Sequence, residues 1–203
     1  MDRDFIAKHV LCGSVPVMCG AALYFLMLYT AGRKQSAEHI ITSLLFCLYI
    51  VGILTVTGIC VKAAFSPRIV LVPFVDMISG PVDTVLNILM FIPMGFFLPA
   101  MYKEYDRISR TAVTALLISL SIETVQAFGY GTTDINDLIT NTAGACTGYI
   151  MYRALCSTVL RPWIKRSRIK GIRCSCELLF FCLFSLLSMI TVQVSIYHAV
   201  FMH

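Results

Sequence analysis

Carboxylate and amide side chains gather in one stretch of the chain, between residues 123 and 141. Glu123 and Gln126 lie three residues apart, so they share one face of a helix. Asp134 and Asp137 have the same spacing. Carboxylates grouped in this way transfer protons or share a divalent cation. The residue types therefore predict an acid–base site or a cation site formed by Glu123, Asp134 and Asp137, and they leave the two alternatives open.

Each of these polar residues also has a structural interpretation. Asp134 has the position of a helix N-cap, and for this residue alone we favour capping over chemistry. Asn87 fits a hydrogen bond to a neighbouring helix as well as it fits a ligand. Asn141, one turn beyond Asp137, fits a helix contact surface. Glu123 is different, because a carboxylate inside a membrane helix costs on the order of 2–3 kcal/mol in insertion unless it is paired or hydrated.

The elements that carry these residues are apolar segments of membrane-spanning length. The 203 residues are 58% hydrophobic and 13% charged, whereas about a quarter of the residues in soluble domains are charged. A spanning helix needs roughly 20 apolar residues. Six segments meet this requirement: Val10–Thr30, Ile40–Val61, Thr84–Tyr102, Ile108–Phe128, Ile135–Leu155 and Leu178–Val200. We therefore predict an all-α integral membrane protein, a bundle of about six transmembrane helices in one membrane domain over residues 1–203.

Proline and glycine mark two helices of this bundle. Pro93 and Pro99 lie inside the third segment, which predicts that this helix is kinked or broken. Gly144 and Gly148 lie four residues apart in the fifth segment, a spacing that lets another helix approach closely. We expect these two glycines to serve packing.

The 16 Lys and Arg residues are divided unequally between the two ends of the predicted helices. One side receives twelve of them, most of them near a basic loop at residues 156–177, and the other side receives four. The side richer in Lys and Arg faces the cytoplasm in most membrane proteins. We therefore expect a cytoplasmic basic loop and both termini outside. A nucleic-acid partner is excluded, because the basic residues lie between apolar blocks and form no single solvated face.

The four histidines lie away from the carboxylates in the sequence, and no arrangement of serine, histidine and aspartate forms a nucleophile motif. We expect the histidines to be interfacial residues. They are His9, His39, His198 and His203.

Four sequence blocks resemble the VanZ-like membrane proteins, a bacterial family named for a teicoplanin-resistance protein. The blocks are LVPF at Leu71–Phe74, LNILMFIPMGFFLP at Leu86–Pro99, SIETVQ at Ser121–Gln126 and TDINDLITNTAGACTGY at Thr133–Tyr149. They occur in the family's order and spacing, and the similar core covers residues 68–153.

The resemblance implies functional positions for the polar residues. The positions that the family motif marks are Asn87, Glu123, Gln126, Asp134, Asp137 and Asn141, together with Pro93, Gly95, Gly144 and Gly148. The family often has an arginine three residues before the first aspartate, where this chain has Gly131. Arg68, next to the LVPF block, is the candidate substitute for that cation.

The resemblance and the residues together imply a multi-pass protein of the bacterial cytoplasmic membrane. We expect it to bind or modulate an envelope lipid, a lipid-linked envelope precursor or a lipophilic glycopeptide, either in teicoplanin-type resistance or in a housekeeping role. The alternative is an intramembrane enzyme, with Glu123 as acid or base, Asp134 and Asp137 holding a divalent cation or a substrate hydroxyl, and the amides orienting them. A small transporter ranks third, because the chain shows no internal repeat.

Overall fold

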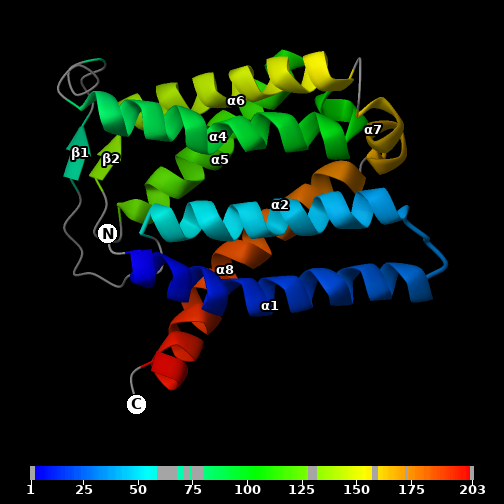
Figure 1. The fold of residues 1–203 in the computed structure, drawn as a ribbon, viewed down its shortest axis with the longest axis horizontal. Coiled ribbons are helices and arrows are strands. Elements are labelled where there is room, and N and C mark those ends of the chain that lie inside the picture. Colours follow the sequence, from blue (N-terminus) through cyan, green and yellow to red (C-terminus); the bar gives the residue numbers. More distant parts are fainter. Residues whose placement is uncertain are drawn as a thin grey trace. The chain divides into compact units, whose positions relative to one another are not determined.

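The computed structural model describes residues 3–58, 68–70, 74, 80–127, 132–156, 160–171 and 173–201. Contacts within the chain divide it into two compact units (Figure 1). Unit 1 comprises Met1–Lys62 and Ile172–His203, and unit 2 comprises Ala63–Gly171. The single membrane domain that we predicted therefore contains two groups of helices, each with its own internal contacts.

The described part of unit 1 contains three long helices, α1 (Arg3–Thr30), α2 (Ala37–Val56) and α8 (Arg173–Phe201). Each of these helices packs against the other two. The Ser36 side chain accepts the backbone N–H of His39 and thereby caps the start of α2. Apolar side chains fill the centre of the unit, including Val51 on α2 and Met189 on α8, which are fully buried.

In its described residues, unit 2 contains three long helices, two short ones and two short strands. Its elements are β1 (Arg68–Val70), α4 (Pro81–Met101), the 3₁₀ helix η1 (Lys103–Tyr105), α5 (Ile108–Gln126), β2 (Thr132–Asp134), α6 (Ile135–Cys156) and α7 (Arg161–Ser167). Helices α4 and α6 lie side by side, with the two strands near one end and α7 near the other (Figure 1). We call these the strand end and the α7 end of unit 2.

The strand end is closed by a parallel pair of strands. Arg68, Ile69 and Val70 pair with Thr132, Thr133 and Asp134. This pairing joins the segment before α4 to the segment before α6. It brings together parts of the chain that are more than sixty residues apart.

Glycines allow the backbones of α4 and α6 to touch. A Cβ atom on Gly95 would lie 1.8 Å from the Ala145 carbonyl oxygen, and one on Gly148 would lie 1.9 Å from the Ile92 carbonyl oxygen. Gly144 meets the Ile88 carbonyl in the same way, at 2.2 Å. The predicted packing role of Gly144 and Gly148 is therefore confirmed, and Gly95 contributes from the other helix.

The third predicted helix is α4, and it is continuous from Pro81 to Met101 with Pro93 and Pro99 inside it. The expectation that this helix is broken is wrong, whereas a kink at Pro93 stays a prediction. Proline removes one backbone hydrogen bond, but the close contact with α6 supports the helix on both sides of Pro93.

The structure confirms an all-α membrane protein with two minimal strands. In the part of the chain that the structure describes, five helices are long and apolar enough to cross a membrane, namely α1, α2, α4, α5 and α8. Helix α6 corresponds to the remaining predicted span and has 22 residues, about 33 Å at 1.5 Å per residue. Among the described residues it is the one long helix too polar to count as an apolar span, because its first turns carry Asn136, Asp137 and Asn141.

Candidate functional site at the strand end of unit 2

Glu123 lies near the end of α5 and is only 2% exposed. Its Oε2 atom accepts the backbone N–H of Asp134 at 3.1 Å. This hydrogen bond ties the end of α5 to β2, eleven residues later in the chain. A buried carboxylate needs such donors, since burial without them costs free energy. Glu123 is thus positioned at the junction of α5, β2 and α6.

Asp134 caps α6, as its structural interpretation predicted. Its Oδ1 atom accepts the backbone N–H of Asn136 at 2.8 Å and the side-chain amide of Asn136 at 2.9 Å. An aspartate that accepts an N–H of the first turn satisfies one of the unpaired donors of a helix start. This role uses one carboxylate oxygen of Asp134.

Asn136 is a site residue that the sequence analysis missed. It is 3% exposed, and its Oδ1 atom accepts the backbone N–H of Phe74 at 2.7 Å. Phe74 has a positive φ of 72°, which is uncommon for a residue with a side chain. Asn136 therefore anchors the last residue of the LVPF block to α6. The signal in the sequence was an amide directly after the predicted cap, within one of the recognised blocks.

Asn87 and Asp137 meet between α4 and α6. The Nδ2 atom of Asn87 donates to Oδ1 of Asp137 at 2.6 Å, and both side chains are half-buried. One turn deeper, the amide of Asn141 donates to Ser119 Oγ on α5 at 2.9 Å. The Oδ1 atom of Asn141 is buried and has no hydrogen-bond partner in the part of the chain that the structure describes. Two predicted amides thus connect α6 to both of its neighbours.

The three carboxylates are close enough to affect one another electrostatically. The charges of Asp134 and Asp137 both act on Glu123, and those of Asp134 and Asp83 act on Asp137. The described residues nevertheless include no group of three or more His, Cys, Asp or Glu side chains arranged to hold a metal ion. Some of the carboxylate oxygens accept hydrogen bonds within the protein: Glu123 accepts the backbone N–H of Asp134, and Asp134 accepts that of Asn136.

The remaining predicted residues lie around this group. Gln126 is in the last turn of α5 and is half-buried. The backbone of Arg68 lies in β1 opposite Thr132, two positions along the sheet from the Val70 and Asp134 pair. Gly131 lies outside the described residues.

An apolar surface of α4 adjoins the polar group. The side chains of Val82, Val85, Leu86 and Leu89 are between 52% and 68% exposed, and they flank Asn87 in the sequence. Exposed apolar side chains on a membrane-spanning helix are suited to contact with lipid chains. The strand end therefore combines a polar cluster with an apolar wall.

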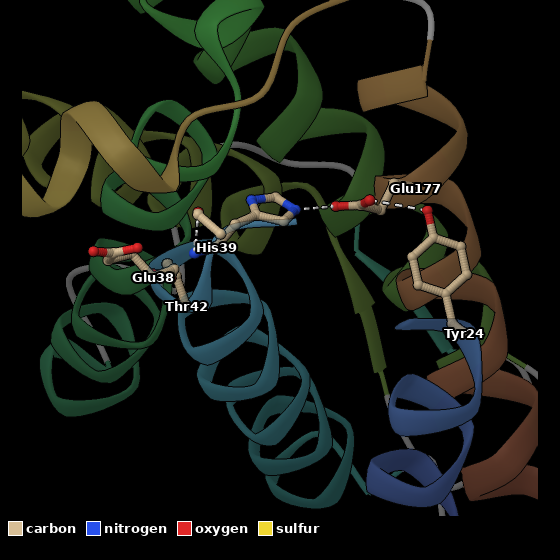
Figure 2. Close-up of polar contacts among 6 residues, drawn as sticks. Tyr24, Glu38, His39, Thr42 and Glu177 are labelled. Carbon is tan, nitrogen blue, oxygen red and sulfur yellow. Dashed lines mark hydrogen bonds and ion pairs between the residues drawn. The ribbon is translucent and has the colours of Figure 1, made fainter. Parts of the chain in front are cut away.

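A second buried polar cluster lies in unit 1, outside the predicted site (Figure 2). His39 Nε2 and Glu177 Oε1 are 2.7 Å apart, and the Tyr24 hydroxyl donates to Glu177 Oε2 at 2.9 Å. The side chains of His39 and Glu177 are both fully buried. His39 lies in the first turn of α2, and its expected place at the membrane interface stays a prediction; within the unit, an acid from α8 provides it with a partner.

His9 is buried as well, and its expected place at the membrane interface also stays a prediction. It is 5% exposed, stacks on the ring of Tyr197 at 4.1 Å and is paired with Gln193. His198 is exposed, and His203 lies outside the described residues.

The fold and the site together define a multi-pass helical membrane protein with a buried polar cluster at one end of a three-helix group. The sequence profile described as VanZ/LLP1 matches residues 15–159 of this chain. The chain belongs to this family. The match includes most of α1 and all of α2, so it extends beyond the core at residues 68–153 that the sequence blocks indicated.

A curated relative supports the same assignment. Protein VanZ of Enterococcus faecium is 40% identical over 67 residues, which are 32% of this chain and 41% of that protein. The chain thus matches about two fifths of the length of this relative. No solved structure matches this chain significantly.

Proposed function

We propose that the strand end of unit 2 binds the polar headgroup of an envelope lipid, a lipid-linked envelope precursor or a lipophilic glycopeptide, and that the protein thereby modulates the cell envelope. The single observation that carries this proposal is the convergence of Glu123, Asp137 and Asn87 from three helices beside an exposed apolar face of α4. A ligand with an apolar tail and a polar head fits such a surface.

The chemistry of the cluster indicates which headgroups would bind. The three carboxylates and the Oδ1 atom of Asn141, which has no partner among the described residues, offer hydrogen-bond acceptors. Acceptors of this kind complement hydroxyl and ammonium groups, which donate hydrogen bonds. We therefore expect a sugar or amine headgroup rather than a bare phosphate. Membership of the VanZ/LLP1 family supports an envelope role of the teicoplanin-resistance type or of a housekeeping type.

The proposal is tested by teicoplanin and vancomycin susceptibility of a bacterial deletion strain that carries the wild-type gene, Glu123→Gln or Asp137→Asn. Asp83→Asn is the matched control, because it removes the same charge from an exposed side chain near Asp137. Membrane levels of each variant are measured by immunoblot. We expect Glu123→Gln and Asp137→Asn to lose resistance to teicoplanin selectively at normal protein levels, whereas Asp83→Asn behaves like the wild type.

Equal susceptibility of all strains to both drugs contradicts the glycopeptide part of the proposal. The envelope-lipid part is then tested separately, by the lipid composition of the same strains. If Asp137→Asn leaves both drug susceptibility and lipid composition unchanged, the site has no role in either.

An intramembrane enzyme is the second candidate, and the burial of Glu123 favours it. A carboxylate at 2% exposure that accepts the backbone N–H of Asp134 can serve as a general acid or base. Acid–base chemistry requires a titrating group at this position, so Glu123→Gln abolishes turnover if the protein is an enzyme. Full complementation by Glu123→Gln excludes that mechanism and leaves binding intact.

A further inference from the structure

The α7 end of unit 2 presents a surface whose exposed charged side chains are all basic, within the described residues. Segments from η1 to α5, from the end of α6 and from α7 contribute to it. Its exposed basic residues are Lys103, Arg107, Arg110, Arg153, Arg161, Lys165, Arg166 and Lys170. We call this set the basic surface.

The two acids of the same region are engaged inside it. Asp106 forms ion pairs with Arg168 at 2.9 Å and with Arg153 at 3.5 Å. Glu104 accepts the backbone N–H of Gly171 at 2.6 Å. Both carboxylates are only partly exposed, and two acids cannot offset the eight exposed basic residues, so most of the charge of the basic surface is presented outward.

Helix α7 is docked with one face inward. Ile164 is 3% exposed and packs in a cluster with Ala100 of α4 and Tyr152 of α6, and Ser167 is also buried. The neighbouring side chains of Lys165 and Arg166 are exposed, and Trp163 is 41% exposed. A short amphipathic helix with a partly exposed tryptophan beside basic residues is typical of a segment that lies in the membrane interface.

We propose that the basic surface binds anionic phospholipid headgroups, with Trp163 at the depth of the headgroup region. Charge complementarity supports this partner, because clusters of Lys and Arg next to spanning helices attract anionic lipids. The orientation of a membrane protein depends only on how many Lys and Arg residues lie on each side of the membrane. The inward acids and the docked α7 are additional features, and they concentrate that charge at one depth. This inference is independent of the function proposed for the strand end.

The chain contains one tryptophan, so its fluorescence reports on this surface alone. The full-length protein is reconstituted in phosphatidylcholine bilayers that contain a small, equal fraction of either brominated phosphatidylglycerol or brominated phosphatidylcholine. Bromine quenches tryptophan on contact. We expect the anionic brominated lipid to quench Trp163 several-fold more than the zwitterionic one, and this preference to decline as salt is added.

Two charge-matched variants separate the basic surface from the net charge of the protein. Lys165→Gln with Arg166→Gln should remove most of this several-fold preference at low salt, because each basic residue near the surface contributes about fivefold to the attraction of anionic lipid. Arg33→Gln with Lys34→Gln removes the same charge from exposed residues of unit 1 and should leave the preference unchanged. Equal quenching by both lipids, no quenching by either, or equal loss in the two variant pairs overturns the proposal.

Discussion

The amide of Asn87 donates to the carboxylate of Asp137 across 2.6 Å, and this contact joins α4 to α6 beside the candidate site. We predict that Asn87→Ala lowers the free energy of unfolding by about 1–3 kcal/mol, because it leaves a partly buried carboxylate without its donor. Asp137→Asn should leave the folded amount nearly unchanged, because asparagine keeps an oxygen that accepts the same hydrogen bond. Reversible unfolding in detergent measures both changes. Equal losses of folded protein from the two variants would mean that Asp137 is chiefly a structural residue.

We expect a different effect from replacing Asp134, because its described contacts are those of a helix N-cap. Asp134→Ala should destabilise the protein by about 1 kcal/mol, since α6 loses the acceptor for the Asn136 backbone N–H. Asp134→Asn is the matched variant, because it retains an acceptor oxygen and should lose only a few tenths of that amount. Helix content and thermal unfolding, compared between the two variants, check this. If alanine and asparagine destabilise equally, the charge of Asp134 matters more than its cap.

Among the single residues, we expect the largest loss of stability from the buried pair of His39 and Glu177 in unit 1. His39→Ala should cost about 3–5 kcal/mol, because it leaves the fully buried Glu177 with one fewer partner. His198→Ala, on the same unit but exposed, should cost less than about 0.5 kcal/mol. The yield of folded protein in membranes and its thermal stability in detergent distinguish them. A small effect of His39→Ala would show that solvent or other groups replace the histidine.

At the scale of elements, the contact between α4 and α6 depends on the absence of side chains. Gly148→Ala should strongly reduce the folded amount, because its Cβ would lie 1.9 Å from a backbone oxygen of Ile92 and the backbone cannot yield. Gly52→Ala is the matched control within a helix, since no described atom beyond the adjoining turns of its own helix lies within 4 Å of its Cβ position. That substitution should be neutral or stabilise α2 by up to about 1 kcal/mol. Similar behaviour of the two variants would contradict the close contact.

The polarity of α6 has a consistent explanation at the same scale. Its inner face is buried against α4 and α5, so its asparagines and its first-turn acid contact protein rather than lipid. Polar side chains are tolerated inside a membrane protein when another helix supplies the hydrogen-bond partner. A helix of this kind is less apolar than an isolated span. This explains why α6 is long enough to cross a membrane and yet too polar to count as an apolar span.

For the whole molecule, the unequal distribution of Lys and Arg predicts that both termini face outward. Fusion of alkaline phosphatase to the C-terminus should give an active enzyme, because this reporter folds only outside the cytoplasm, whereas a green fluorescent protein fusion there should be dark. Reporters placed in the basic segment near α7 should give the opposite result. Concordant signals at both positions would mean that α8 does not place them on opposite sides of the membrane, and its assignment as a span would need revision.

Several features of the fold were predictable because they depend on local sequence. Helix α5, predicted at residues 108–128, spans Ile108–Gln126, and α6, predicted at residues 135–155, spans Ile135–Cys156. Long apolar runs specify helices because the backbone must satisfy its own hydrogen bonds in lipid. The packing role of Gly144 and Gly148 was equally visible, since their spacing places them on one helix face.

Other features depend on which distant segments meet. The carboxylates of Glu123 and Asp137 could be recognised by type and spacing, but the partners of Asn87 and Asn136 could not, because Phe74 and Asp137 come from separate elements. The pairing of β1 with β2 escaped prediction, since three-residue strands have no periodic pattern to detect.

The sequence by itself determined the membrane class, the positions of the long helices and the polar residues of the candidate site, because these follow from composition and helical periodicity. Only the tertiary structure decided how those residues are used. It assigned Asp134 to a cap, paired Asn87 with Asp137 and buried His39 against Glu177. The physical reason is that a polar side chain in an apolar environment takes the nearest available partner, and nearness between separate helices is a property of the packed molecule.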